Sequence, residues 1–351
     1  MDHRPVRPRQ PGRVPGRRVR NGLRPGGELA GQRTHHDHAG VRRQRDGRDH
    51  RQARLSASGP TAHRGHAPWN GHASWCVARR LPILENNVTA TAIEPLHLTP
   101  EGYHVIGPDV GAPGLWARES IGPFVEVQAV GPLVTVHDSR FDPDRGIGHH
   151  PHQRMERLFY ILEGTVDHDD ALNSITGHMG TGDLGILTEG QRGMIHSEWN
   201  HSDGPARAYI FVYPTDPLPP TASFGTVRDG EAARARPAPG VVTKQVIERG
   251  SRRLHGDVRE FNDSSIDERA AVDMRLGPEE AGLVFVIDGT VTLQEGDERA
   301  AMADAEREHT VLLPPASAPR DLRLVAHEPS RVLHAVTGPG FGLRRRQPSS
   351  S

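Results

Sequence analysis

Short apolar runs recur along the chain, first between residues 124 and 212 and again between residues 241 and 336. They are bounded by Gly, Pro, Asp or Asn, which is typical of the strands of an antiparallel sandwich or barrel. The first series comprises 124–130, 133–136, 158–162, 184–187 and 208–212. The second series comprises 241–247, 270–276, 283–287, 291–293, 310–313, 322–325 and 332–336. The pattern therefore predicts an all-β protein.

The two series share one local pattern. Residues 159–166 (FYILEGTV) resemble residues 285–291 (FVIDGTV), and in both an apolar run meets an acidic residue and a glycine before a second run begins. This arrangement predicts a hairpin. An internal duplication of one barrel explains the repeat. A proline-rich break at 214–220 marks the linker, so we expect one domain over 95–220 and a second over 235–345.

Residues 1–88 have neither helical nor strand periodicity and are rich in Arg, Pro, Gly and His. Residues 1–85 hold 18 Arg and 6 acidic residues, which gives a net charge of +12. Because the whole chain has a net charge of −1, the remaining residues have a net charge of −13. We expect a disordered extension, because so few apolar groups cannot offset the entropy of ordering. There are two alternatives. The segment could bind nucleic acid through phosphate contacts, which we do not expect without an aromatic platform, or His35, His36 and His38 could bind metal adventitiously.

The remaining composition limits the setting. Cys76 is the single cysteine, which excludes an intramolecular disulfide. No apolar run approaches the roughly 20 residues that span a bilayer, and no apolar stretch follows the N-terminus. We therefore expect a cytoplasmic protein with no membrane partner.

Two short couples of side chains carry the candidate chemistry. His150 and His152 are two residues apart, as are His196 and Glu198. On a strand, side chains two apart share a face, so each couple can point into a barrel. If the two strands are neighbours, three imidazoles and one carboxylate converge on one cation. That ligand set suits a first-row divalent metal and leaves coordination positions open.

Context decides how specific these couples are. With 22 His in the chain, about one His-x-His sequence is expected by chance. The N-terminal segment does contain a second one, at His36 and His38. The first couple, however, directly precedes the predicted strand and glycine turn at 155–164, and the second follows a turn at 182–183. We therefore predict a metal site rather than exposed loop histidines.

These residues also resemble a known family. The spacing His150-x-His152-x3-Glu156-x7-Gly164, followed by Gly182-Asp183 and His196, resembles the two motifs of cupins. Four consecutive blocks narrow the resemblance to the pirins: His150-Pro151-His152, 160–170 (YILEGTVDHDD), 180–183 (GTGD) and 193–198 (GMIHSE). The resemblance is strong over 145–200 and looser over 95–345.

The resemblance implies two tandem cupin (jelly-roll) β-barrels with metal, usually iron, in the first barrel only. It places His150, His152, His196 and Glu198 on the family's ligand positions. Glu156 stands at the carboxylate position of ordinary cupins, and its even spacing from His152 keeps it as the alternative to Glu198. Pirins usually have Arg-Gly-Phe after the second His, whereas this chain has Gln153-Arg154-Met155, which changes the rim of the pocket.

Three neighbours of the motifs have simpler interpretations. We expect His149 to face solvent, because its parity opposes that of His150. We expect Tyr160 and Met194 to be barrel core rather than substrate platforms.

The second copy lacks the couples. His152 and His150 lie 12 and 14 residues before Gly164. The residues at the same distances before Gly289 are Gly277 and Arg275, and residues 314–320 contain no His or carboxylate. We therefore expect the second barrel to be metal-free and structural.

Three functions remain open. The resemblance implies an Fe(II)-dependent dioxygenase of the quercetin 2,3-dioxygenase type, with a small aromatic substrate and dioxygen, in which Glu198 takes the substrate's proton. The alternative is a regulatory protein whose metal oxidation state controls a protein partner. A metal-dependent isomerase or another cupin activity is a third possibility, because the same ligands serve many reactions.

Overall fold

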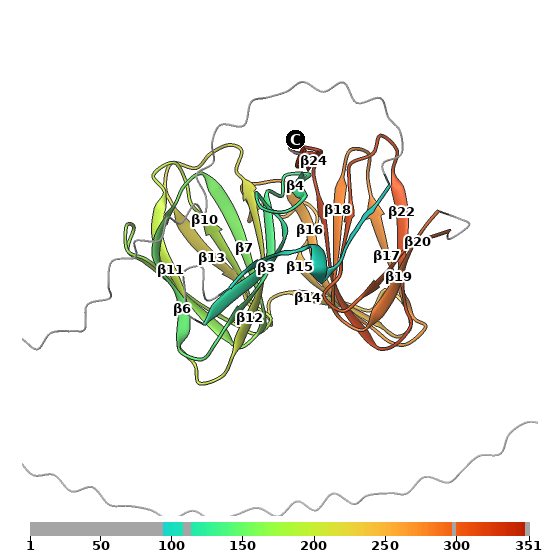
Figure 1. Cartoon of the computed structure of the whole chain (residues 1–351), viewed down its shortest axis with the longest axis horizontal. Coiled ribbons are helices and arrows are strands. Elements are labelled where there is room, and N and C mark those ends of the chain that lie inside the picture. Colours follow the sequence, from blue (N-terminus) through green and yellow to red (C-terminus); the bar gives the residue numbers. More distant parts are fainter. Residues whose placement is uncertain (1–93, 108–113, 297–299, 348–351) are drawn as a thin grey trace, which may run out of the picture. The chain divides into compact units, whose positions relative to one another are not determined.

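The computed structural model describes residues 94–107, 114–296 and 300–347. Over these residues the chain forms 24 strands and one short 3-10 helix, η1 (Pro100–Gly102), which confirms the all-β prediction (Figure 1). The extension expected over residues 1–88 lies outside the described residues. Across the described part of the chain, no helix is long and apolar enough to cross a membrane.

The first barrel consists of a seven-stranded and a four-stranded antiparallel sheet. The large sheet runs in the order β13 (Ser223–Val227), β10 (Leu184–Thr188), β7 (Met155–Glu163), β12 (Ala206–Pro214), β5 (Thr135–Phe141), β3 (Leu115–Ile121), β2 (His104–Ile106). The small sheet runs in the order β6 (Arg145–His152), β11 (Met194–Asn200), β8 (Thr165–Asp170), β9 (Ile175–Gly180).

The second barrel repeats this arrangement. Its large sheet runs in the order β1 (Leu96–Leu98), β21 (Thr310–Leu313), β18 (Ala281–Asp288), β23 (Ser330–Thr337), β16 (Val258–Ile266), β15 (Val241–Ile247), β14 (Ala233–Ala235). Its small sheet runs in the order β17 (Ala271–Leu276), β22 (Arg320–Ala326), β19 (Thr290–Glu295), β20 (Ala300–Glu306). The strand orders correspond position by position, as an internal duplication requires, and the fold is two tandem cupin barrels.

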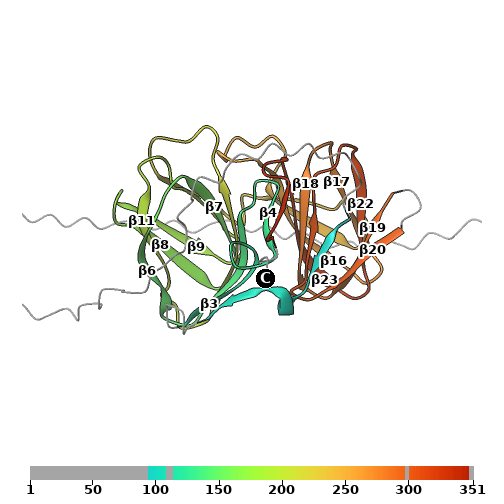
Figure 2. The same cartoon turned by 45° about the horizontal axis from the view of Figure 1, so that its top comes forward.

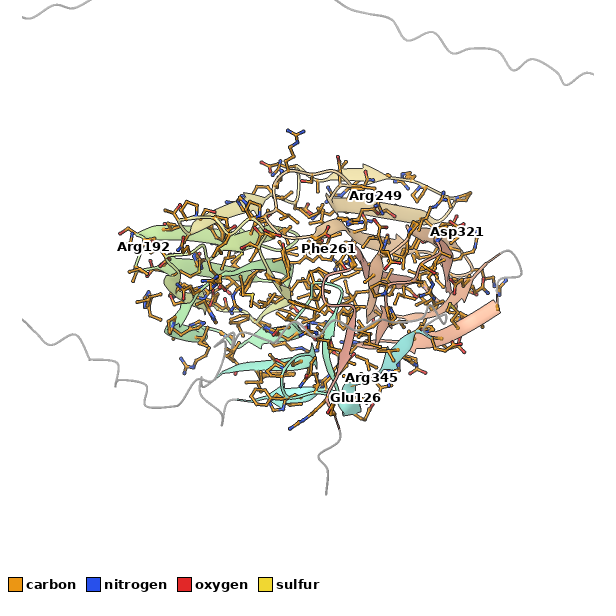
Figure 3. The ribbon with its side chains drawn as sticks, turned by 90° about the horizontal axis from the view of Figure 1, so that it is seen from above. Glu126, Arg192, Arg249, Phe261, Asp321 and Arg345 are labelled. Atoms are coloured by element: carbon orange, nitrogen blue, oxygen red, sulfur yellow. The ribbon has the colours of Figure 1, made fainter. Side chains whose placement is uncertain are left out.

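The ends of the two barrels are interleaved along the chain. β1 precedes the first barrel in sequence but pairs with β21 of the second, where it is the cyan strand beside the orange sheet (Figures 1 and 2). At the other end, β24 (Leu343–Arg345) returns to pair with β4 (Val127–Val130). Arg345 and Glu126 accompany that pairing, with Nη1 and Oε1 3.4 Å apart (Figure 3). The last strand of the first barrel, β13, follows the prolines at 214–220, so the chain leaves this barrel only after residue 227. The domain boundaries 95–220 and 235–345 remain a prediction.

The repeated acidic–glycine turn does not close a hairpin, so that prediction is wrong. β7 belongs to the large sheet and β8 to the small one, and the same holds for β18 and β19. The turn instead carries the chain from one sheet to the other. Gly164 and Gly289 have φ of +71° and +85°, and a Cβ on either would lie within 2.4 Å of another segment. Both positions therefore need glycine.

The large sheets of the two barrels pack against each other through apolar outer faces. One continuous core contains side chains of both sheets, including Tyr160, Tyr209, Phe211, Phe261 and Phe285. Phe261 lies at its centre (Figure 3), with ring centroids 5.2 Å from Tyr160 and 5.1 Å from Phe211. Alternate residues of the same strands face inward, so each barrel also has its own interior core. The candidate chemistry lies in the first interior.

Candidate metal centre

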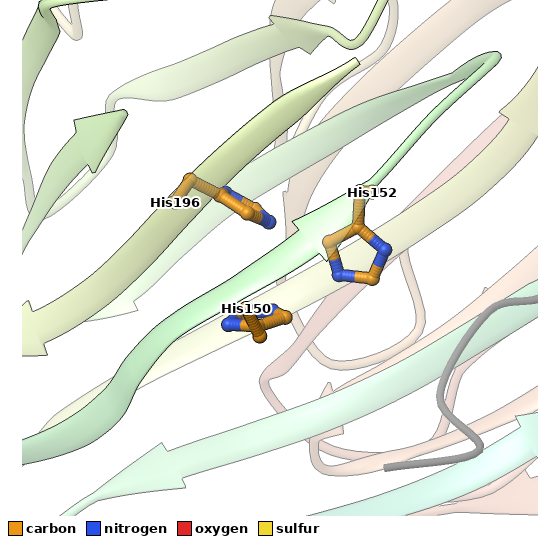
Figure 4. A group of neighbouring side chains, drawn as sticks. All are labelled: His150, His152 and His196. Atoms are coloured by element: carbon orange, nitrogen blue, oxygen red, sulfur yellow. The ribbon is translucent and has the colours of Figure 1, made fainter. Parts of the chain in front are cut away.

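The two histidines of the first couple meet the histidine of the second. His150 and His152 lie on β6, and His196 lies directly opposite His150 on β11. The three side chains face the interior and one another (Figure 4), with ring centroids 4.6 to 4.9 Å apart. Their candidate ligand atoms lie within 4.8 Å of one another, and no ring is more than 9% exposed. The first couple therefore meets His196 of the second couple.

Glu198 follows His196 on the same buried face of β11. A β-bulge separates the pairing of His196 with His150 from that of Glu198 with Ile147. The Oε1 atom of Glu198 lies 2.5 Å from Nδ1 of His196. It also lies 3.5 Å from Nδ1 of His168, which faces it from β8.

His168 is the residue that sequence reasoning missed. It lies opposite Glu198 on β8, is 1% exposed, and stacks on Phe224 with centroids 5.1 Å apart. Together with His196 and Glu198 it forms a second group whose ligand atoms lie within 4.8 Å of one another. The available signal was the alternation in 166–170, where an imidazole stands at an inward position between Val166 and Asp170.

Several buried polar atoms of this cluster have no hydrogen bond within the described residues. They are both ring nitrogens of His168 and of His196, and Oε1 of Glu198, since the 2.5 Å contact lacks hydrogen-bond geometry. A buried polar atom without a partner costs about 1–3 kcal/mol. Imidazole nitrogens and a carboxylate oxygen brought together in this way fit a first-row divalent cation.

Hydrogen bonds to the outer nitrogens distinguish His150 from His152. His150 can donate Nδ1–H to the carbonyl oxygen of Gly148 at 2.8 Å, which leaves the Nε2 lone pair for a metal. His152 instead accepts a hydrogen bond at Nδ1 from the Arg157 guanidinium, also at 2.8 Å. Since a neutral imidazole has one acceptor nitrogen, ligation by Nε2 of His152 requires that this bond be given up.

Arg157 is a second side chain that the sequence did not single out. It lies on β7, is 6% exposed, and donates from Nε to Oε1 of the fully buried Glu189 at 2.7 Å. A guanidinium at this place opposes a cation through its charge, while Glu189 balances that charge. The strand that carries Arg157 begins at Met155, after a two-residue link from β6. In this link, Gln153-Arg154, Arg154 has a φ of +77°.

The electrostatics set the protonation that a metal needs. Burial lowers the pKa of His150 to about 4. Burial, followed by the charge of Arg157, also lowers the pKa of His152. Burial alone would raise the pKa of Glu198, but the charge of His196 and the close contacts of its carboxylate with the His168 and His196 rings hold that pKa well below its usual value. At neutral pH His150 and His152 are therefore neutral and Glu198 is ionised.

Glu156 does not join the cluster, so its role as alternative ligand is wrong. Its carboxylate accepts hydrogen bonds from the hydroxyls of Thr188 and Tyr213 at 2.8 Å, and from the backbone N–H groups of His255 and Gly256. The even-spacing argument assumed one continuous strand, but β6 ends at His152 and β7 begins at Met155. The turn between them resets the parity, so Arg157 faces the site and Glu156 faces outward.

The Glu156→Ala variant should therefore lose stability and keep its metal. It leaves two buried hydroxyl donors and two partly buried N–H donors without their acceptor, and we expect the free energy of unfolding to fall by about 3–5 kcal/mol. Urea unfolding and metal analysis of the folded fraction measure the two effects. Glu163→Ala, an exposed carboxylate on the same strand, is the control. Metal loss with unchanged stability would contradict this assignment.

The other expectations about neighbouring residues are confirmed. His149 is exposed, with Nε2 2.8 Å from Oδ2 of Asp169. Tyr160 and Met194 are each 1% exposed in apolar cores.

The second barrel has aliphatic side chains at the equivalent places. The cross-strand pairs put Met274 opposite Leu322, as His150 stands opposite His196, and Leu324 opposite Leu293, as Glu198 stands opposite His168. The positions of His150, His152, His196, Glu198 and His168 are thus taken by Met274, Leu276, Leu322, Leu324 and Leu293. All five belong to the interior core and are at most 4% exposed. The equivalents counted from the sequence, Arg275 and Gly277, are each one residue too late, because the links after β6 and β17 differ in length.

Comparison with known proteins gives the context of this site. Residues 110–211 match the family model described as Pirin. The chain is 26% identical to a quercetin 2,3-dioxygenase of Escherichia coli over 192 residues, which are 52% of this chain and 80% of that protein. It is 35% identical to human pirin over 94 residues, 26% of this chain and 31% of pirin.

Solved structures show the same fold. The bacterial pirin YhhW of Escherichia coli, in complex with nickel(II), matches with a TM-score of 0.53 and 20% identity over 68% of this chain and 99% of its own. Oxalate decarboxylase of Bacillus subtilis matches with a TM-score of 0.52 and 13% identity over 73% of this chain and 79% of its own.

Proposed function

We propose that this chain, whose residues 110–211 match the Pirin family model, is a metal-dependent dioxygenase acting on a flavonol or a similar hydroxylated aromatic. The observation that supports this most directly is the burial of the four proposed ligands in the first barrel. His150, His152 and His196 form one group, and Glu198 shares a second group with His196 and His168. The name quercetin 2,3-dioxygenase of the Escherichia coli relative supplies the substrate class and dioxygen.

We assign the metal to these four side chains, with Fe(II) as the preferred ion and another first-row divalent ion as the alternative. Such an ion supplies Lewis acidity, which favours the deprotonated form of a substrate hydroxyl. His150 would bind through Nε2, since its Nδ1–H is held by Gly148. His152 would bind after turning away from Arg157.

Glu198 is the base in this proposal. Its carboxylate is ionised, 3% exposed, and held from two sides by His196 and His168. A fixed, charged carboxylate beside the proposed ligands can take the proton of the substrate hydroxyl. The apolar interior formed by residues such as Phe159, Ile161 and Met194 keeps water from the reacting groups. Uptake of one dioxygen, opening of the ring and loss of one carbon monoxide balance the reaction.

The test is oxygen uptake by protein loaded anaerobically with Fe(II) and then given quercetin and air. We expect one carbon monoxide released for each dioxygen consumed. A sample stripped with a chelator should be inactive and should regain activity when Fe(II) is returned. Turnover that persists without metal, or loaded protein that consumes no oxygen with quercetin or other flavonols, rejects the proposal.

A further inference from the structure

A cavity of about 490 Å³ opens into the second barrel, between strands β14, β15 and β16 of its large sheet, with β23 beside them, and β17 of its small sheet. β17 and β16 correspond to β6 and β5, and the cavity shares one position with the metal cluster of the first barrel, since Met274 is the equivalent of His150. Arg249, which Figure 3 shows at the margin of the fold, belongs to its rim. The volume lies within the range of pockets that hold small organic molecules.

One wall of the cavity is polar and uncharged. It is formed by Thr243 and Gln245 on β15, Asn262 on β16 and His334 on β23. Thr243 Oγ1 lies 2.9 Å from Oγ of the buried Ser264, and that oxygen lies 3.0 Å from Nε2 of His334. Burial lowers the pKa of His334 to about 4, so its ring is neutral at pH 7. This chain of hydrogen bonds holds the wall in place.

Two amides of this wall have no protein partner. Within the described residues the side chains of Asn262 and Gln245 make no hydrogen bond, and Asn262 is only 8% exposed. Neither amide has an atom that is both fully buried and without a partner, so their donors and acceptors face the cavity and its solvent, where a ligand can replace water. The lumen-facing neighbours Val241 and Ile266 on the same strands are aliphatic, so the polarity is confined to the cavity.

The opposite wall is apolar, and it includes Val272 and Met274 on β17. Met274 stands where the first barrel has His150, and a thioether makes favourable contacts with aromatic rings. A planar ring would therefore fit between a hydrogen-bonding wall and an apolar one.

The charges near the mouth are paired. The Arg249 guanidinium binds the carboxylates of Glu260 and Glu280, the latter at 2.6 Å. Arg275 lies 3.5 Å from Asp321, and Asp273 lies 3.1 Å from Arg323. Among the described residues that line the cavity, each charged side chain therefore has an oppositely charged partner, which disfavours an ionic ligand.

We propose that the second barrel binds an uncharged aromatic or heteroaromatic molecule that carries hydroxyl, carbonyl or amide groups along one edge. Asn262 and Gln245 donate to and accept from these groups, and Met274 contacts the ring. The site uses no metal and none of the side chains of the first barrel, so it stands apart from the proposed dioxygenase activity.

The test is isothermal titration of the full chain, stripped of metal, with 4-hydroxybenzamide as the probe. Two matched probes carry charge on the same ring, 4-hydroxybenzoate and 4-hydroxybenzylamine. We expect saturable binding of the uncharged probe and at least fivefold weaker binding of both ions. Asn262→Leu should weaken binding at least fivefold, since it removes a donor and an acceptor at similar volume. His196→Ala in the first barrel should leave binding unchanged.

Thr243→Val, which removes one hydroxyl from the wall at constant volume, serves as the second variant, and thermal unfolding identifies folded samples. No saturable binding, equal binding of an ionic probe, or unchanged binding by folded Asn262→Leu and Thr243→Val would overturn the proposal. Loss of binding in His196→Ala would move the ligand to the first barrel and overturn it as well.

Discussion

His196→Ala is expected to lower the affinity for a divalent metal by more than about 100-fold and to abolish oxygen uptake with a flavonol. His196 is the one residue shared by the two groups of candidate ligands, His150–His152–His196 and His168–His196–Glu198. Its removal therefore leaves neither group with three ligands. Metal titration monitored by calorimetry, together with elemental analysis of the purified protein, measures the loss.

The control for this variant is His149→Ala. His149 is next to His150 in the sequence but is exposed and bound to Asp169, so metal affinity should stay within about twofold of the unmodified chain. Equal loss in both variants would mean that the metal is held outside the barrel. Full metal content in His196→Ala would remove the basis of the site.

Glu198→Gln should separate proton transfer from metal binding. The amide keeps the size of the carboxylate and one ligand oxygen but is no longer a base, so we expect the turnover number to fall by about 100- to 10,000-fold. Metal affinity should fall by less, because the three imidazoles remain. Oxygen uptake measured at full metal occupancy isolates the catalytic effect.

Two comparisons sharpen this experiment. Glu163→Gln, an exposed carboxylate on β7, should leave both turnover and metal affinity unchanged. A flavonol supplied at a pH where its hydroxyl is already ionised should recover part of the turnover lost in Glu198→Gln, because no proton then has to be taken. Unchanged turnover in metal-loaded Glu198→Gln would assign the base to another group.

The strands that sequence reasoning located are those with an apolar face toward a core. The runs 241–247 and 310–313 match β15 and β21 residue for residue, and 158–162 and 208–212 lie inside β7 and β12. The strands that it did not locate by an apolar run include β3, β6, β9, β11 and β16. Several of their inward residues are polar, such as His150, His196, Glu198 and Asn262. These strands therefore lack the apolar alternation by which a half-buried strand is recognised.

The candidate site shows the same division. The two couples are visible in the sequence because each joins residues two apart on one strand, where the backbone alone decides that they share a face. His168 is not visible in this way, because its role depends on β8 pairing with β11 and not on spacing. Arg157 rather than Glu156 faces the site because a two-residue turn separates β6 from β7. A shift of one residue along a strand moves every side chain to the other face.

What the sequence determined by itself is the local information: the strand type of the apolar runs, the duplication, and the two couples of candidate ligands. Only the tertiary structure decided which strands become neighbours. It thereby placed His168 beside Glu198 and Arg157 beside His152, and it formed a partly polar cavity in the second barrel. The physical reason is that a strand's own periodicity sets the face of each side chain, whereas pairing across sheets, turns and barrels depends on packing between residues far apart in the chain.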